Sequence, residues 1–242
     1  MKQHLSVLML AARSTLYKLL GLFLIMAAAE SVLFYITMQK AQAEGLHGLE
    51  QMITQSRLAL VCGVCFLLVC TLLSLTGCEL FGSKLRYTIK RLSVREGTTV
   101  LWWAVYNILI FFVFWAVQLL IVLLLCRFYT STLDPAQLSD QTMFLAFYRH
   151  KFLHSLLPLA ETSRYIRNVI LILGLGVSSA CFSFRQRQNQ KGIAIFLLAV
   201  VTVLMFSREM GSFGNDIFMM LIVLVVAGSA VVNIWKEPGD EN

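Results

Sequence analysis

The stretch that decides the fold is TVLWWAVYNILIFFVFWAVQLLIVLLLC, residues 99–126, which contains no charged side chain. An α-helix rises about 1.5 Å per residue, and about 20 apolar residues are enough to cross the hydrocarbon of a bilayer. A helix over residues 99–126 is therefore long enough to span a membrane and either to tilt within it or to protrude from it. The stretch predicts a membrane-spanning helix.

The composition of the whole chain agrees with this prediction. Of its 242 residues, 58% are hydrophobic and 14% are charged, and the mean hydropathy is +0.76. A water-soluble domain needs about a quarter charged residues to cover its surface. The short segments of alternating polarity that are typical of a transmembrane β-barrel are not visible in the sequence. We therefore expect an all-α polytopic membrane protein, with residues 1–242 forming a single transmembrane domain.

Apolar stretches of spanning length recur along the chain. We expect six spans, at residues 16–38, 57–82, 99–126, 166–184, 192–207 and 216–235. The first exceeds the length of a signal-peptide h-region, so we expect it to be retained, although AQA at residues 41–43 resembles a cleavage site. The fifth is barely long enough and is expected to pair tightly with the sixth through a short turn. Residues 1–14 predict an interfacial helix that precedes the first span.

The cations indicate how the chain is oriented. Cations gather before or at the start of the first span and after the second, fourth and sixth. They are Lys2, Arg13, Lys18, the cations of residues 82–99, Arg185, Arg187, Lys191 and Lys236. Short connectors rich in Lys and Arg stay in the cytoplasm. The pattern predicts that both termini are cytoplasmic and that residues 127–165 form a long outer loop, whose own cations count less because long loops contribute little to orientation.

The outer loop contains an apolar segment, MFLAFYRHKFLHSLLPL, at residues 143–159. Three basic residues at its centre make it too costly to span the membrane, so we expect a helix that lies along the outer interface or dips into it. On such a helix His150 and His154 would share one face and could form half of a metal site. No third ligand is evident nearby, so we predict no metal site.

Residues 82–99, GSKLRYTIKRLSVREGTT, form a basic connector between the second and third spans. Leu85, Ile89 and Leu92 follow helical spacing and form one apolar stripe, with cations on both flanks. Such a helix lies flat on the inner leaflet. Attraction to anionic lipid is sufficient to explain its charge, and makes membrane lipid one expected partner.

This architecture, with an interfacial helix, six spans and a basic cytoplasmic helix between spans two and three, resembles the permeases of type-2 ABC exporters, in their small bacterial form. The segment YTIKRLSVRE, residues 87–96, is similar to the coupling helix of that family. The resemblance implies that Tyr87, Lys90, Arg91 and Arg95 dock on a separate ATP-binding subunit. One difference is that well-known members have their long outer element between spans five and six.

The resemblance also implies a function. The chain would be a multi-pass protein of a bacterial plasma membrane that works with a second copy or a homologous permease. It would export a peptide, an antibiotic or a lipid-like substrate, and the sequence does not decide among these. The alternative is a non-transporting membrane protein that acts as a scaffold or as the partner of a sensor.

The chemistry absent from the sequence is consistent with a non-catalytic subunit. The chain has no G-x-x-x-x-G-K-[ST] motif and no H-E-x-x-H motif, so we expect no catalytic residues and no cofactor in this chain, with ATP and Mg²⁺ bound by the partner. CGVC at residues 62–65 lies inside a span and is interpreted as apolar packing. No basic face with interleaved aromatic residues is present, so nucleic acid is not an expected partner.

Two features inside the predicted spans point to specific contacts. Glu30 lies deep in the first span, where a lone charge costs at least about 2.5 kcal/mol. It is therefore protonated, paired with another helix, or part of a polar path for substrate. Gly174 with Ser178, and Gly176 with Ala180, have the small-xxx-small spacing that allows close contact between helices.

Overall fold

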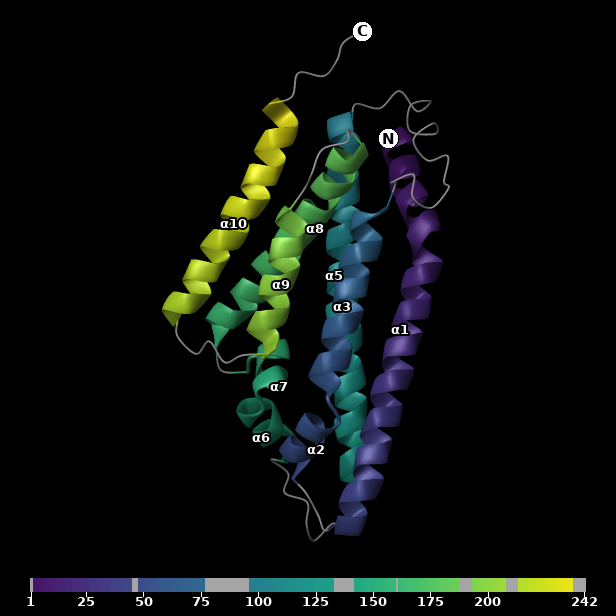
Figure 1. The fold of residues 1–242 in the computed structure, drawn as a ribbon, viewed down its shortest axis with the longest axis vertical. Helices are drawn as coiled ribbons and strands as arrows, with labels where there is room; N and C mark the ends of the chain where they lie inside the picture. Colours follow the sequence, from purple (N-terminus) through teal and green to yellow (C-terminus); the bar gives the residue numbers. More distant parts are fainter. Residues whose placement is uncertain are drawn as a thin grey trace.

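The computed structural model describes residues 2–44, 48–76, 96–132, 142–159, 161–187, 193–207 and 213–236. Every regular element in these ranges is an α-helix, so the all-α prediction is confirmed for this part of the chain. In chain order the helices are α1 (Lys2–Glu44), α2 (Leu49–Gln55), α3 (Leu58–Ser74), α5 (Glu96–Thr132), α6 (Thr142–Arg149), α7 (Lys151–Leu156), α8 (Thr162–Arg187), α9 (Ala194–Ser207) and α10 (Phe213–Lys236) (Figure 1).

Four of these helices, α1, α5, α8 and α10, are long and apolar enough to cross a membrane. Helices α2 and α3 meet at a bend of 48° and together make a fifth candidate. The bend falls at Arg57, whose backbone is left-handed with φ of 53°. The fifth predicted span, residues 192–207, corresponds to α9, which has 14 residues and rises only about 21 Å. The helices are compatible with a multi-pass membrane protein with four or five candidate spans in the described residues.

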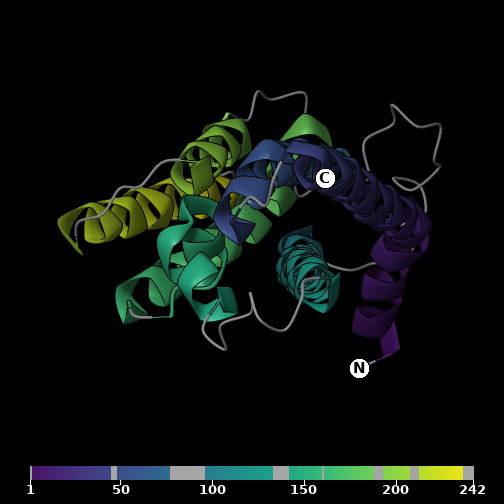
Figure 2. The same cartoon turned by 90° about the horizontal axis from the view of Figure 1, so that it is seen from below.

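The long helices run along one axis in alternating directions (Figure 1). The first turns of α1 and the last turns of α10 lie at the same end of the bundle, where α3 ends and α5 begins. The short helices α2, α6 and α7 gather at the opposite end, which we call the cap end. Helices α1 and α10 lie on opposite flanks, with α5 and α8 between them (Figure 2).

Helix α8 is the centre of the bundle. Its apolar stretch is 72% buried, against 17% to 33% for the other three long helices, and it packs most extensively against α5 and α10. A Cβ at Gly176 would lie 2.8 Å from the backbone nitrogen of Ile108 in α5, and one at Gly174 would lie 2.3 Å from Val223 Cγ1 in α10. The predicted close packing at these two glycines is therefore confirmed.

Outward-facing side chains of the bundle are largely apolar, as a lipid environment requires. Tyr17 and Leu24 in α1 are 80% and 71% exposed, and Val225 in α10 is 69% exposed. Because such side chains gain nothing from water, they indicate a surface that faces lipid tails.

Three expectations about helix arrangement are wrong. Residues 2–14 do not form a separate interfacial helix, because α1 continues without a break from Lys2 to Glu44. The outer apolar segment does not form one helix, because the chain turns extended at His150 between α6 and α7. The fifth apolar stretch does not pair mainly with the sixth, because α9 and α10 each pack more extensively on α8.

Candidate functional site

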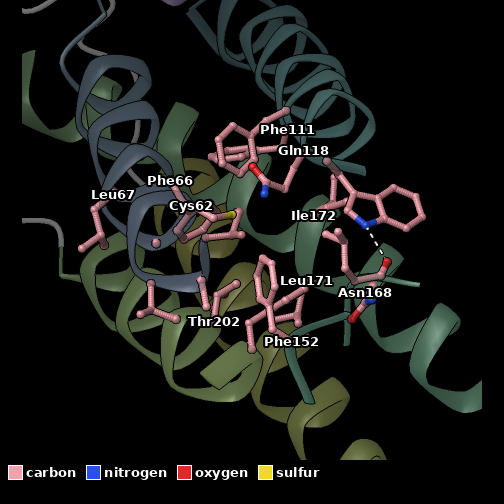
Figure 3. Close-up of a pocket in the computed structure, with 18 of the residues that line it drawn as sticks. Cys62, Phe66, Leu67, Phe111, Gln118, Phe152, Asn168, Leu171, Ile172 and Thr202 are labelled. Atoms are coloured by element: carbon pink, nitrogen blue, oxygen red, sulfur yellow. Dashed lines mark hydrogen bonds between the residues drawn. The ribbon is translucent and has the colours of Figure 1, made fainter. Parts of the chain in front are cut away.

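A cavity of about 310 Å³ lies inside the bundle, between α3, α5, α8 and α9, with α7 on its cap-end side (Figure 3). Its walls are mainly aromatic and aliphatic. The aromatic wall residues are Phe66, Phe111, Phe114, Trp115, Phe152 and Phe206. Only a few polar groups reach the walls, among them Gln118, Asn168 and Thr202. A mostly apolar cavity with a few convergent polar groups is the usual form of a small-molecule site.

Glu30, the carboxylate that the sequence singled out, does not line this cavity but lies behind Gln118, which does. Its side chain is completely buried, and Gln118 Nε2 donates a hydrogen bond of 3.1 Å to Glu30 Oε2. The first of the three alternatives, a protonated carboxyl, stays open, but Glu30 does pair with a neighbouring helix.

Gln118 was not predicted from the sequence as a site residue. It lies in α5, 88 positions from Glu30, and its side chain is also completely buried. The sequence feature that could have identified Gln118 is a polar amide side chain inside the uncharged stretch 99–126. Asn107, the other amide there, donates 2.8 Å to Ser179 Oγ of α8, so both amides of this stretch bond to another helix.

The Glu30–Gln118 pair leaves two oxygen atoms without a partner. Neither Glu30 Oε1 nor Gln118 Oε1 has a hydrogen-bond donor among the residues that the structure describes. A buried acceptor without a donor costs about 1–3 kcal/mol. The pair is therefore a set of two acceptors beside an apolar cavity.

A second buried polar cluster borders the cavity near the cap end. Arg167 Nη1 donates to Asp216 Oδ1 at 2.8 Å, and both side chains are almost fully buried. Ser163 Oγ donates to Asp216 Oδ2 at 3.1 Å. Asn168 accepts from Arg167 and donates to the Ser155 carbonyl at 2.9 Å, which joins α8 to α7. Nothing in the sequence distinguishes Arg167 and Asp216 from ordinary charges at span ends.

Histidines at the cap end hold α6 and α7 in place. His150 Nε2 lies 3.1 Å from Thr54 Oγ1 of α2, and His150 Nδ1 accepts from the Leu153 amide at 3.5 Å, as the N-cap of α7. Burial lowers the pKa of the His150 imidazole from its ordinary 6.5. His154 lies 3.9 Å from Glu161, which pairs with Arg164.

These contacts also bear on the metal pair that the sequence raised. His150 is the N-cap of α7, and its ring contacts the Leu153 amide and Thr54, so the structure assigns this imidazole to capping and to the contact with α2. Across the described residues, no group of three or more His, Cys, Asp or Glu side chains is placed to hold a metal ion. The five described cysteines carry free thiols, and Cys62 of the CGVC sequence lines the cavity.

The predicted coupling residues Tyr87, Lys90, Arg91 and Arg95 lie outside the described residues, as does the whole segment 77–95. The structure does place the helices that flank this segment. Both α3, which precedes it, and α5, which follows it, line the cavity.

Comparisons of this chain with models of protein families, with curated proteins and with solved structures find no match. Its function is therefore inferred from the cavity, from the polar groups around it and from the connector between α3 and α5.

Proposed function

We propose that this chain is the non-catalytic transmembrane subunit of an ATP-driven exporter of the type-2 ABC class, in a bacterial plasma membrane. It works with a separate ATP-binding subunit, which binds ATP and Mg²⁺, and with a second permease copy or relative. The observation that carries the proposal is the apolar cavity inside the helix bundle. A cavity of this kind suits a substrate that enters from lipid, such as a lipid-like molecule or an apolar peptide.

The connection between the cavity and the basic connector supports a mechanical role. The connector joins α3 directly to α5, and these two helices contribute Phe66 and Phe111 to the cavity, with ring centroids 6.0 Å apart. A displacement of the connector by a docked ATPase would therefore move two walls of the cavity at once. Alternating access needs such a link between the site of ATP hydrolysis and the substrate path.

The same-end arrangement of the flanking helices also supports the proposal. The start of α1, the end of α10 and both flanks of the connector lie at one end of the bundle (Figure 1). The cations predict that this end is cytoplasmic, which places the connector where a cytoplasmic ATPase can reach it.

A non-transporting scaffold or sensor partner is the second candidate. The observation that favours it is the tight packing of α8, whose Gly176 lies against the α5 backbone. A buried ion pair between Arg167 and Asp216 further fastens α8 to α10. Such a bundle resists the rearrangement that transport needs, and suits a rigid docking platform.

Substitutions in the connector separate the two candidates. The first observation is whether a neighbouring gene encodes an ATPase with a Walker motif. The chain is then co-expressed with that ATPase, and co-purification and ATPase activity are measured in nanodiscs. We expect Tyr87→Ala, which leaves charge unchanged, to lower affinity for the ATPase by more than about tenfold, because buried aromatic anchors dominate interfaces. Reversing Arg91 and Arg95 to Glu should do the same, and Lys2→Gln is the control.

The opposite result is equally specific. If Tyr87→Ala binds the ATPase like the wild type, and losses follow only the net charge removed, the connector is a lipid-binding helix. Each cation near an anionic leaflet contributes about 1 kcal/mol, so losses would then be gradual and independent of position.

A further inference from the structure

Among the residues that the structure describes, two carboxylates are buried, Glu30 and Asp216, and their surroundings differ. Asp216 faces the Arg167 guanidinium at 2.8 Å and also accepts from Ser163. Glu30 receives one hydrogen bond, from the neutral amide of Gln118, and no cationic side chain pairs with it among the described residues. A buried carboxylate without a countercharge is costly, so Glu30 requires either a proton or a cation from outside the chain.

The geometry at Glu30 favours a cation that can donate hydrogen bonds. Glu30 Oε1 and Gln118 Oε1 are both acceptors that find no donor among the described residues. A primary ammonium carries a positive charge and three N–H donors, so from the cavity it can donate to the Gln118 amide and place its charge beside the Glu30 carboxylate.

The aromatic wall of the cavity favours the same chemistry. Phe66 lies with its ring centroid 6.0 Å from that of Phe111 and 5.9 Å from that of Phe114, and all three line the cavity together with Gln118 (Figure 3). Aromatic ring faces attract cations through their quadrupoles. An anionic head group would meet both the rings and the Glu30 carboxylate unfavourably.

We propose that the cavity binds amphipathic amines, with the apolar body between α3, α5, α8 and α9 and the ammonium group at Gln118, where the Glu30 carboxylate behind it supplies the countercharge. That such an amine is the exported substrate rests on the proposed export function, whereas the binding of the amine does not. The site is selective for two properties of the ligand, because the walls favour an apolar body and the acceptor pair favours a protonated amine.

The test uses the purified full-length chain in nanodiscs without any ATPase. Binding of 1-aminoadamantane is measured by titration calorimetry and compared with 1-adamantanol, which has the same apolar cage and a neutral hydroxyl group. We expect the amine to bind at least about tenfold more tightly, as a charge-assisted hydrogen bond in a buried site provides.

Three variants assign the preference to named groups. Glu30→Gln keeps the size of the side chain and removes its charge, and should lower amine affinity to that of the alcohol. Gln118→Leu removes one acceptor and should lower the affinity for the amine several-fold without changing the affinity for the alcohol. Gly63→Leu fills the cavity, where a Cβ has room at 3.8 Å from Val203 Cγ1, and should abolish binding of both.

Glu50→Gln, which removes a carboxylate from α2 at the cap end, is the matched control and should leave both affinities unchanged. Equal affinity of the wild type for amine and alcohol would overturn the inference. So would an amine preference that survives both Glu30→Gln and Gln118→Leu, because Glu30 would then hold its own proton and take no part in binding. If the chain binds the amine but does not co-purify with the ATPase, the binding site stands and only the role of the amine as exported substrate is removed.

Discussion

At the scale of single residues, the Arg167–Asp216 pair shows how the bundle compensates the desolvation cost of a buried charge. Both side chains are almost fully buried, and the pair is completed by hydrogen bonds to Ser163 and Asn168. Removing one partner leaves the other charge buried without compensation, whereas replacing both by apolar residues of similar size is often neutral.

We therefore expect Arg167→Met alone to destabilise the bundle by about 3–5 kcal/mol. The double variant Arg167→Met with Asp216→Leu should recover most of that loss. Thermal unfolding midpoints in nanodiscs measure both effects. If the double variant is as unstable as the single one, the charges contribute through geometry that apolar side chains cannot replace.

Glu30 and Gln118 support a second prediction at this scale. Glu30→Leu leaves the Gln118 amide without its only acceptor in the described residues, and should cost about 1–3 kcal/mol of stability. Glu30→Gln can keep a hydrogen bond between two amides and should cost less. The comparison is made by thermal unfolding, and equal midpoints for the wild type and both variants would show that the pair has no structural role.

At the scale of elements, the contacts of α8 depend on residues without a Cβ. Gly176 lies against the backbone of α5, which cannot move aside as a flexible side chain can. Gly21 in α1 is also helical, but an added Cβ there would meet nothing within 4 Å. Substitutions at the two positions therefore separate the effect of helix propensity on stability from the effect of packing.

We expect Gly176→Ala to destabilise the bundle by about 1–3 kcal/mol, because the added methyl group forces α5 and α8 apart. Gly21→Ala should be neutral or stabilising by up to about 1 kcal/mol, because alanine favours a helix more than glycine does. Unfolding midpoints of the two variants give the answer. A loss of the same size at Gly21 would mean that close packing is not the cause.

The joint between α6 and α7 predicts a dependence on pH. His150 accepts a hydrogen bond from the Leu153 amide only when its Nδ1 is unprotonated, and its pKa is lowered by burial. The unfolded chain therefore binds this proton more readily than the folded chain does. The contribution of His150 to stability is fully present above pH 6.5 and falls as the pH drops from there toward the lower folded pKa.

His150→Ser is the matching variant, since serine can cap a helix and does not titrate in this range. The wild type should lose more stability than His150→Ser when the pH is lowered from 7.5 to 5.5. The measurement is the difference between their unfolding midpoints at the two values. Parallel losses would assign the pH dependence to groups other than His150.

At the scale of the whole molecule, the alternating helices place the start of α1 and the end of α10 at one end of the bundle (Figure 1). The distribution of cations predicts that this end is cytoplasmic. Single cysteines at Ser93 and Arg187 should then be protected from an impermeant thiol reagent in intact cells, whereas one at Asp140 should react. Native cysteines are first replaced, and labelling of position 93 from outside would reverse the predicted orientation.

The sequence alone determined the class of the protein, because the hydrocarbon of a bilayer acts on each segment separately. A helix that faces lipid tails must satisfy its own backbone and carry apolar side chains over about 20 residues, and this requirement is visible in residues 99–126 without any knowledge of neighbours. The same argument identified Glu30 as an unusual residue, because a carboxylate at that depth is costly in any arrangement.

Only the tertiary structure decided which groups meet. Gln118 lies 88 positions from Glu30, and Asp216 lies 49 positions from Arg167, so no local period connects either pair. The packing of α9 and α10 on α8 could not be predicted from the sequence either, because apolar helices in lipid have no polar face that indicates which helix is their neighbour. Contacts between such helices depend on shape and on a few buried hydrogen bonds, and these exist only once the bundle is assembled.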